Sequence, residues 1–170
     1  MPTSASIKIK KMRRGEACLA RPKLALAVQY AATDVGLPTR PQVRRWVQAA
    51  LLHTAEITVR FVAVEEGQNL NREYRGKDAA TNVLSFVYAS DPASGPISGD
   101  LVLCAPLVTH EAQQQNKKLR AHYAHLIVHG VLHLQGFDHE TAAEAQVMEA
   151  REREIVMRFG FPDPYVAGDA

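Results

Sequence analysis

Apolar residues at every second position predict four β-strands in this chain. The clearest alternation is that of Leu24, Leu26, Val28 and Tyr30. Such a period of two is typical of a strand with one buried face. Three further segments have a strand-like pattern, namely Ile57–Phe61, Val83–Val87 and Gly99–Cys104. Between the last two, residues 90–98 contain two prolines and a glycine, so they are expected to form a surface connection.

Apolar residues three and four positions apart predict helices in the remaining segments. Thr39 followed by Pro41 is a typical helix start, and an apolar stripe with Trp46 follows, so Trp46 is expected to anchor the core. Gly136 and Gly160 are expected to end two later helices. The expected helices span about residues 39–51, 65–74, 106–116, 118–135 and 141–159.

This interleaving of strands and helices indicates a mixed α/β (α+β) fold. We expect about four strands packed with five or six α-helices. A chain of 170 residues, 46% of them hydrophobic, can bury one proper core. We therefore expect a single domain over residues 21–165, an irregular N-terminal lead-in over 1–20 and a tail over 166–170.

Neither a membrane span nor export is expected. No stretch approaches the run of about 20 apolar residues that a bilayer-spanning helix needs. Basic residues near the N-terminus precede a short apolar stretch, residues 17–20, but Arg21 and Lys23 interrupt it at once. The two cysteines, Cys18 and Cys104, are far apart in the sequence and belong to no paired motif. A disulfide framework and a cysteine-bound zinc are therefore not indicated, and a cytoplasmic location is expected.

The net charge of +2 conceals an uneven distribution of charge along the chain. Residues 1–137 hold 17 Lys and Arg against 10 Asp and Glu, a net of +7, whereas residues 138–170 hold 3 against 8, a net of −5. An acidic, solvated C-terminal helix explains this, and so does a basic surface suited to a polyanion such as RNA. Charge alone slightly favours the first interpretation.

The segment from His129 to His139 predicts a divalent metal site. Histidines four residues apart lie on one face of a helix, with side-chain roots about 6 Å apart, so His129 and His133 can converge on one ion. Gly136 can adopt the positive φ that ends a helix and turns the chain, which would bring His139 back to the same point. Three imidazoles leave one coordination position open, as in catalytic zinc sites. One Zn²⁺ is expected, although other divalent transition metals also suit imidazole ligands.

Neighbouring residues refine this site. The same histidine spacing occurs in metzincin proteases, where a glutamate follows the first histidine as general base, but here that position is Gly130. A peptidase is therefore disfavoured. Asp138 could orient a metal-bound imidazole or cap the next helix, and the two roles are about equally favoured. His125, one turn before His129, is expected to be a hydrogen-bonded core histidine, although it could face the cleft.

Three segments together resemble the YbeY family of bacterial endoribonucleases. They cover most of the chain, from about Ile57 to Tyr165, and their combination is highly specific. The segments are residues 70–86 with Tyr74-Arg75-Gly76-Lys77-Asp78 and Thr81-Asn82-Val83-Leu84-Ser85-Phe86, residues 99–102 with Gly99-Asp100-Leu101-Val102, and residues 121–139 with the three histidines.

The resemblance implies a single α/β domain with a small mixed sheet, and a zinc ion held by His129, His133 and His139 at the end of a cleft. It also implies metal-dependent cleavage of single-stranded RNA, maturation of the 3′ end of the small-subunit ribosomal RNA, and ribosome quality control. The family's functionally important arginine corresponds to Arg75, and its first metal histidine to His129. Arg75 and His129 are therefore expected to be catalytic residues. Arg75 suits a phosphate substrate, because a guanidinium binds phosphate oxygens through two parallel hydrogen bonds.

The first hypothesis is therefore a metal-dependent endoribonuclease whose partners are ribosomal RNA and, by resemblance, the ribosome or small-subunit proteins. Either water or the substrate's own 2′-hydroxyl could attack phosphorus. The alternative is a non-catalytic ribosome-assembly factor that zinc stabilises. A hydrolase acting on peptides or small molecules is the third hypothesis. A monomer is expected, because no exposed apolar heptad or strand edge in the sequence suggests a partner.

Overall fold

The computed structural model describes residues 20–77 and 81–166, and these residues form a three-layer α/β domain. Residues 1–19 of the expected lead-in (1–20), including Cys18, and residues 167–170 of the expected tail (166–170) lie outside the described residues. Four strands and five helices follow the order β1 (Leu24–Tyr30), α1 (Arg40–Ala50), β2 (Ala55–Val62), α2 (Val64–Arg75), β3 (Val83–Ala89), β4 (Ile97–Cys104), α3 (Ala105–Gln114), α4 (Leu119–Leu134) and α5 (Ala142–Arg158). The expected elements are thus confirmed within a few residues at each end.

The strands form one mixed sheet in the order β1-β2-β4-β3. β1, β2 and β4 run parallel, whereas β3 pairs antiparallel with β4 along one edge. β3 and β4 are each two residues longer at the connection than their apolar patterns predict, because Ala89 pairs with Ser98 across a bulge after Val87. A bulge inserts an unpaired residue and so interrupts the period of two on which the prediction depends.

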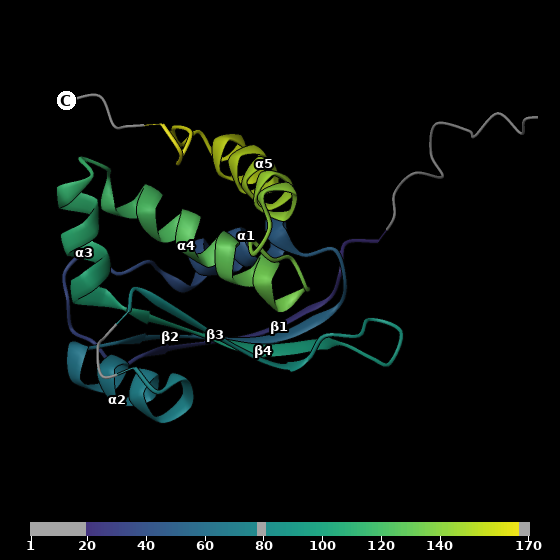
Figure 1. The fold of residues 1–170 in the computed structure, drawn as a ribbon, viewed down its shortest axis with the longest axis horizontal. Coiled ribbons are helices and arrows are strands. Elements are labelled where there is room, and N and C mark those ends of the chain that lie inside the picture. Colours follow the sequence, from purple (N-terminus) through teal and green to yellow (C-terminus); the bar gives the residue numbers. More distant parts are fainter. Residues whose placement is uncertain (1–19, 78–80, 167–170) are drawn as a thin grey trace, which may run out of the picture.

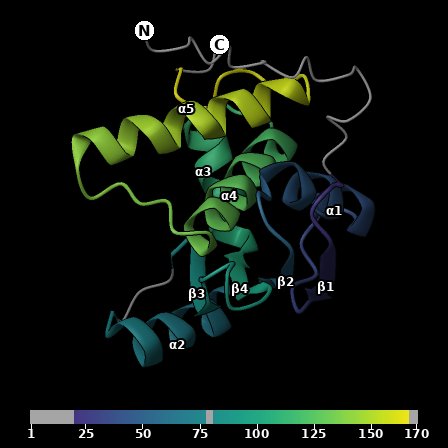
Figure 2. The same ribbon diagram turned by 90° about the vertical axis from the view of Figure 1, so that its right-hand side faces the viewer.

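Helices cover both faces of the sheet, as Figures 1 and 2 show. α4 lies against the sheet on one face, with α1 and α3 beside it and α5 packed over it from outside, whereas α2 lies on the opposite face. Strand residues that point to opposite faces of the sheet belong to two separate apolar clusters. The larger cluster contains Ile57, Val59, Phe61, Leu101 and Leu103 with the sheet-facing side of α4. The smaller one, on the α2 side, contains Val62, Leu84, Val102 and Cys104.

Local sequence signals place the helix ends. Thr39 caps α1 in a reciprocal capping box with Gln42, and Thr141 caps α5 in the same way with Glu144. Each cap satisfies backbone N–H groups that the first turn of a helix leaves without partners. Trp46 is buried as expected, edge-on to Phe161. Among the described residues, no helix has the length and apolar character that crossing a membrane requires.

Candidate metal centre

The end of α4 brings the three predicted histidines together. His129 and His133 lie one helical turn apart, with ring centres separated by 4.6 Å. Gly136, at φ +95°, turns the chain directly after the helix, and the N–H groups of Gly136 and Phe137 close the last turn onto His133 and Leu132. His139 therefore returns to the helix end, with its ring centre 4.9 Å from that of His133 and 5.7 Å from that of His129.

The donor atoms of this triad fit a single divalent ion. One ring nitrogen from each histidine lies within 4.8 Å of the other two. Two nitrogens that are each about 2.1 Å from one ion lie at most about 4.2 Å apart, so small ring rotations complete the closure. His129 and His133 are half-buried and His139 is exposed, which leaves the outer side of the site open to solvent. The three histidines line neither of the two pockets described below, so their expected location in a cleft stays a prediction.

The protonation of His133 favours metal binding. Burial lowers the pKa of His133, and the neighbouring His129 and His139 lower it further. A lowered pKa keeps the imidazole neutral at physiological pH, and the neutral imidazole is the form that ligates a metal.

Glu152 lies against the histidine triad, and sequence reasoning missed it. It lies on α5, is fully buried, and its carboxylate accepts a hydrogen bond from Nδ1 of His129. Its second oxygen accepts from the Tyr165 hydroxyl. A carboxylate on Nδ1 leaves Nε2 of His129 as the nitrogen available to an ion and fixes the ring orientation. Its signal in the sequence was its place among the acidic residues of the C-terminal helix, which were interpreted as solvated.

The environment of Glu152 keeps it ionised. Burial alone would raise the pKa of Glu152, but hydrogen bonds from His125 and His129 outweigh that effect, and the pKa lies below its usual value. A buried carboxylate without such donors would be neutral. Glu152 is therefore an anion held by three donors, which also raises the basicity of the His129 imidazole toward a metal.

The expectation for Asp138 needs correction, and that for His125 is confirmed in part. Asp138 accepts a hydrogen bond from the backbone N–H of His139, whereas Thr141 caps the next helix and Glu152 holds the imidazole of His129. His125 is hydrogen-bonded as expected, with Nε2 3.4 Å from the Tyr165 hydroxyl and 3.5 Å from a Glu152 oxygen. Its side chain is 14% exposed and lines a pocket, so it lies at the margin of the core.

Close packing explains why Gly130 lacks the side chain of a protease base. A Cβ at Gly130 would lie 2.6 Å from Cδ2 of Leu101 on β4, far inside van der Waals contact. The position faces the sheet and not the metal ligands, so a glutamate there would have no room and no access to the site. This geometry removes the peptidase hypothesis in its simplest form.

Arg75 lies at the end of α2, on the other side of the sheet from α4. Its guanidinium donates a hydrogen bond of 3.3 Å to the carbonyl of Ser85 on the edge strand β3. It lines a groove of about 650 Å³ together with Tyr74, Phe86 and Tyr88. Ser85 pairs with Leu101, whose side chain faces α4. Because Arg75 contacts the Ser85 carbonyl, it reaches the β3 edge of the sheet, beside which α4 packs.

Comparisons with known proteins agree on one family. The model of the family described as "Endoribonuclease YbeY" matches residues 34–160. A relative with that name from Nitrosomonas eutropha is 57% identical over 141 residues, which are 83% of this chain and 98% of the relative. Another from Thiobacillus denitrificans is 56% identical over 144 residues, 85% of this chain and 97% of the relative. A solution structure of a Thermotoga maritima protein, 20% identical, shares the fold with a TM-score of 0.53 over 83% of this chain and 99% of that one.

Proposed function

The chain belongs to the YbeY family of endoribonucleases, and from that premise we propose that it cleaves single-stranded RNA at a metal ion held by His129, His133 and His139. The convergence of the three imidazoles at the end of α4 is the observation that carries the proposal. An endoribonuclease is a hydrolase acting on RNA phosphodiester bonds, so the site must bind a phosphate and stabilise added negative charge. An ion with one open position supplies a Lewis acid for this purpose when it is bound.

Zinc is the ion that this donor set suits best. Three nitrogen ligands with one position left for a reactant are the usual composition of a catalytic zinc site. The carboxylate of Glu152 supports this assignment, because a metal-bound imidazole usually donates its second N–H to such a group. A set of hard oxygen ligands, which magnesium or calcium would prefer, is not what the triad offers.

The chain's own residues contribute orientation and charge. Glu152 and Tyr165 fix the ring of His129, so that the ligand geometry is set before a substrate arrives. Arg75 is proposed to bind a phosphate of the RNA at the β3 edge, where its permanent charge lowers the cost of the anionic transition state. Tyr74 and Tyr88, exposed in the same groove, offer faces on which bases of a single strand can stack.

The proposed biological substrate is ribosomal RNA, with maturation of the 3′ end of the small-subunit RNA and ribosome quality control as the processes served. The proposal includes contacts with the ribosome or small-subunit proteins, action as a monomer, and a cytoplasmic location.

A cleavage assay on single-stranded RNA tests the activity. His129→Ala and Arg75→Glu should both abolish cleavage while far-UV circular dichroism shows a retained fold. His53→Ala and Arg44→Glu are matched controls, since both residues are exposed and lie outside the site and the groove. Equal background cleavage by wild type and all variants would reject the enzyme and favour the zinc-stabilised assembly factor. A 2′,3′-cyclic phosphate on the product would identify the 2′-hydroxyl as the attacking group.

A further inference from the structure

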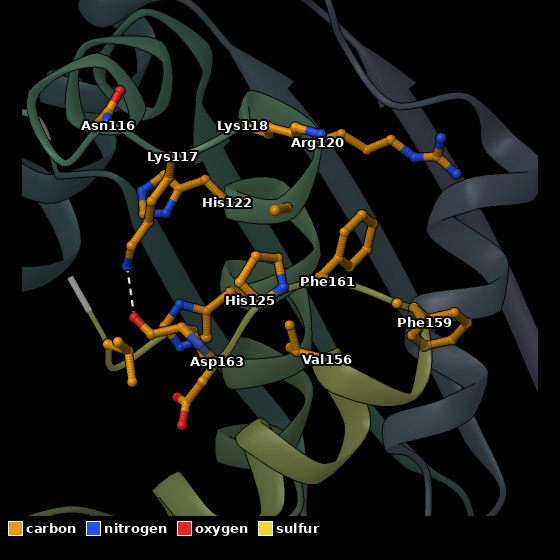
Figure 3. Close-up of a pocket in the computed structure, with 15 residues that line it drawn as sticks. Asn116, Lys117, Lys118, Arg120, His122, His125, Val156, Phe159, Phe161 and Asp163 are labelled. Carbon is orange, nitrogen blue, oxygen red and sulfur yellow. Dashed lines mark hydrogen bonds between the residues drawn. The ribbon is translucent and has the colours of Figure 1, made fainter. Parts of the chain in front are cut away.

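A second pocket lies at the opposite end of α4 from the metal ligands. Its volume is about 710 Å³, and its walls are the first turn of α4, the end of α5 and the segment of residues 159–166 (Figure 3). The basic residues Lys117, Lys118 and Arg120 line it. Asp163, the acid among the lining residues, is already paired with Arg153 at 2.6 Å, so the pocket presents a net positive charge.

The first turn of α4 lacks the groups that usually complete a helix N-terminus. Lys118 occupies the N-cap position without a side-chain hydrogen bond, and the turn contains no acidic residue. Free backbone N–H groups and the positive end of the helix dipole both attract anions. Lys118 and Arg120 add positive charge to an already positive end, which costs stability unless an anion binds there.

His122 provides an independent sign of a ligand. The residue is only 4% exposed, it lines the pocket, and its Nδ1 atom has no hydrogen-bond partner among the described residues. Its Nε2 lies 2.9 Å from a Glu111 oxygen, and Asn82 donates to the same carboxylate. The carboxylate holds the proton on Nε2, which leaves Nδ1 as an acceptor. A buried acceptor without a protein partner is rare, and this nitrogen is suited to accept from an O–H donor, either a hydroxyl group of a ligand or a water molecule.

An aromatic surface adjoins these polar groups. Phe161 and Phe159 line the pocket, and the guanidinium of Arg120 lies 5.8 Å from the ring centre of Phe161. A phenylalanine ring beside an arginine is a surface on which nucleic-acid bases stack. A nucleotide consists of a phosphate, a sugar with hydroxyl groups and a base. The pocket offers the first turn of α4 to the phosphate, His122 to a hydroxyl group and Phe161 to the base.

We propose that this pocket binds one nucleotide of the RNA substrate at a distance from the bond that is cleaved, which rests on the proposed function. The phosphate lies at the first turn of α4, a ribose hydroxyl donates to His122, and the base stacks against Phe161. His125 lies between the pocket and the triad, since it lines the pocket and its Nε2 is 3.5 Å from Glu152. His133 lies eleven positions after His122, a rise of about 16 Å along the helix, and a few nucleotides cover such a span.

A titration with adenosine 5′-monophosphate tests the pocket without any cleavage, because this probe has no phosphodiester bond. In ¹⁵N-labelled, zinc-loaded protein, the amide signals of Ala121, His122 and Phe161 should shift and saturate. Inorganic phosphate should shift only the signals of the α4 first turn. The double variant Lys118→Gln/Arg120→Gln should weaken the nucleotide's Kd about tenfold, and Arg44→Gln on α1 should leave it unchanged.

The same variants separate this proposal from the proposed function. With RNA as substrate, the double variant should raise KM about tenfold and keep kcat. The slope of the logarithm of the binding constant against the logarithm of the salt concentration should become less steep by about 0.7 for each lost phosphate contact. Nucleotide shifts confined to residues near His133 and His139, or an unchanged Kd in the double variant, would overturn the nucleotide pocket while leaving cleavage intact. A wild type that binds the nucleotide but cleaves no RNA would instead reject the proposed activity alone.

Discussion

At the scale of single residues, a buried carboxylate organises the metal centre. Glu152 accepts hydrogen bonds from His129 and Tyr165 and lies 3.5 Å from His125, so that one side chain of α5 connects the triad to the nucleotide pocket. A buried charge is tolerated only with such partners, because desolvation would otherwise cost several kcal/mol. Glu152 therefore orients His129 from a buried position between α4 and α5 that an apolar side chain would otherwise occupy.

Replacing Glu152 by glutamine should weaken zinc binding by about 10- to 100-fold, because the neutral amide no longer raises the basicity of His129. Competition with a chromophoric chelator measures the affinity. Glu154→Gln, a change on the same helix in an exposed pair with Arg158, should leave it unaltered. An unchanged zinc affinity in Glu152→Gln would show that the carboxylate has no role in positioning the ligand.

His122 should make the metal-free protein sensitive to mild acid. Burial lowers the pKa of His122, and the Glu111 carboxylate offsets only part of that effect. The unfolded chain therefore takes up its proton at a higher pH than the folded one, so stability is complete above the unfolded pKa of about 6.5 and falls as the pH drops below it. In chelator, the urea midpoint of the wild type should fall more between pH 7.5 and 5.5 than that of His122→Gln. Parallel losses in both proteins would contradict this assignment.

At the scale of elements, α4 combines three tasks on three parts of its surface. Its sheet-facing residues belong to the main core, its C-terminal end presents His129 and His133, and its first turn forms a wall of the nucleotide pocket. The close approach of α4 to β4 at Gly130 sets the height of the helix over the sheet. Gly99 on β4 makes a matching approach, since a Cβ there would lie 2.6 Å from Cδ2 of Leu134 on α4, so the distance between helix and sheet depends on the absence of a side chain at both glycines.

Gly130→Ala should destabilise the fold by about 1–3 kcal/mol, because its Cβ would meet Leu101 at 2.6 Å and force the two elements apart. Urea unfolding measures the loss. Gly67→Ala on α2 is the matched control, because its Cβ would find only ordinary contacts of 3.5 Å or more with Cys104 and Val62. There the higher helix propensity of alanine should leave stability equal or raise it by up to about 1 kcal/mol. Equal effects of the two changes would contradict the packing argument.

At the scale of the whole molecule, a large apolar core lies beside the histidine triad. The main apolar cluster extends from β1 through the sheet to α1, α4 and α5, and the triad lies at its margin, at the end of α4. A structural zinc, in contrast, stabilises small domains that lack such a core. The fold therefore argues against an ion whose main task is to hold the chain together.

Removing the metal should lower the Tm by about 5–10 °C without unfolding the protein. An ion present at about 100 times its Kd contributes about 2.7 kcal/mol, and each kcal/mol shifts the Tm of a domain of this size by about 2–4 °C. Far-UV circular dichroism with and without chelator, followed by a thermal melt, measures both effects. Loss of the helical signal at 25 °C on chelation would instead support the zinc-stabilised assembly factor.

The sequence by itself determined the elements and the convergence of the three histidines. Strand alternation, the caps at Thr39 and Thr141 and the histidine spacing with Gly136 all depend on backbone geometry within a few residues, so a local pattern contains the whole signal. The four strands were predicted for the same reason, whereas the mixed sheet that they form was expected from the family resemblance. The bulge after Val87 was not predicted, because it depends on pairing with another strand.

Only the tertiary structure decided the contacts between segments distant in sequence. Glu152 meets His129 because α5 packs over α4, Gly130 is required because Leu101 lies beneath it, and Arg75 stands at the β3 edge because α2 covers the other face of the sheet. The pocket at the first turn of α4 likewise exists because residues 159–166 return to it. Such pairings are set by the packing of the whole core, and a local pattern contains no record of which distant residue will become a neighbour.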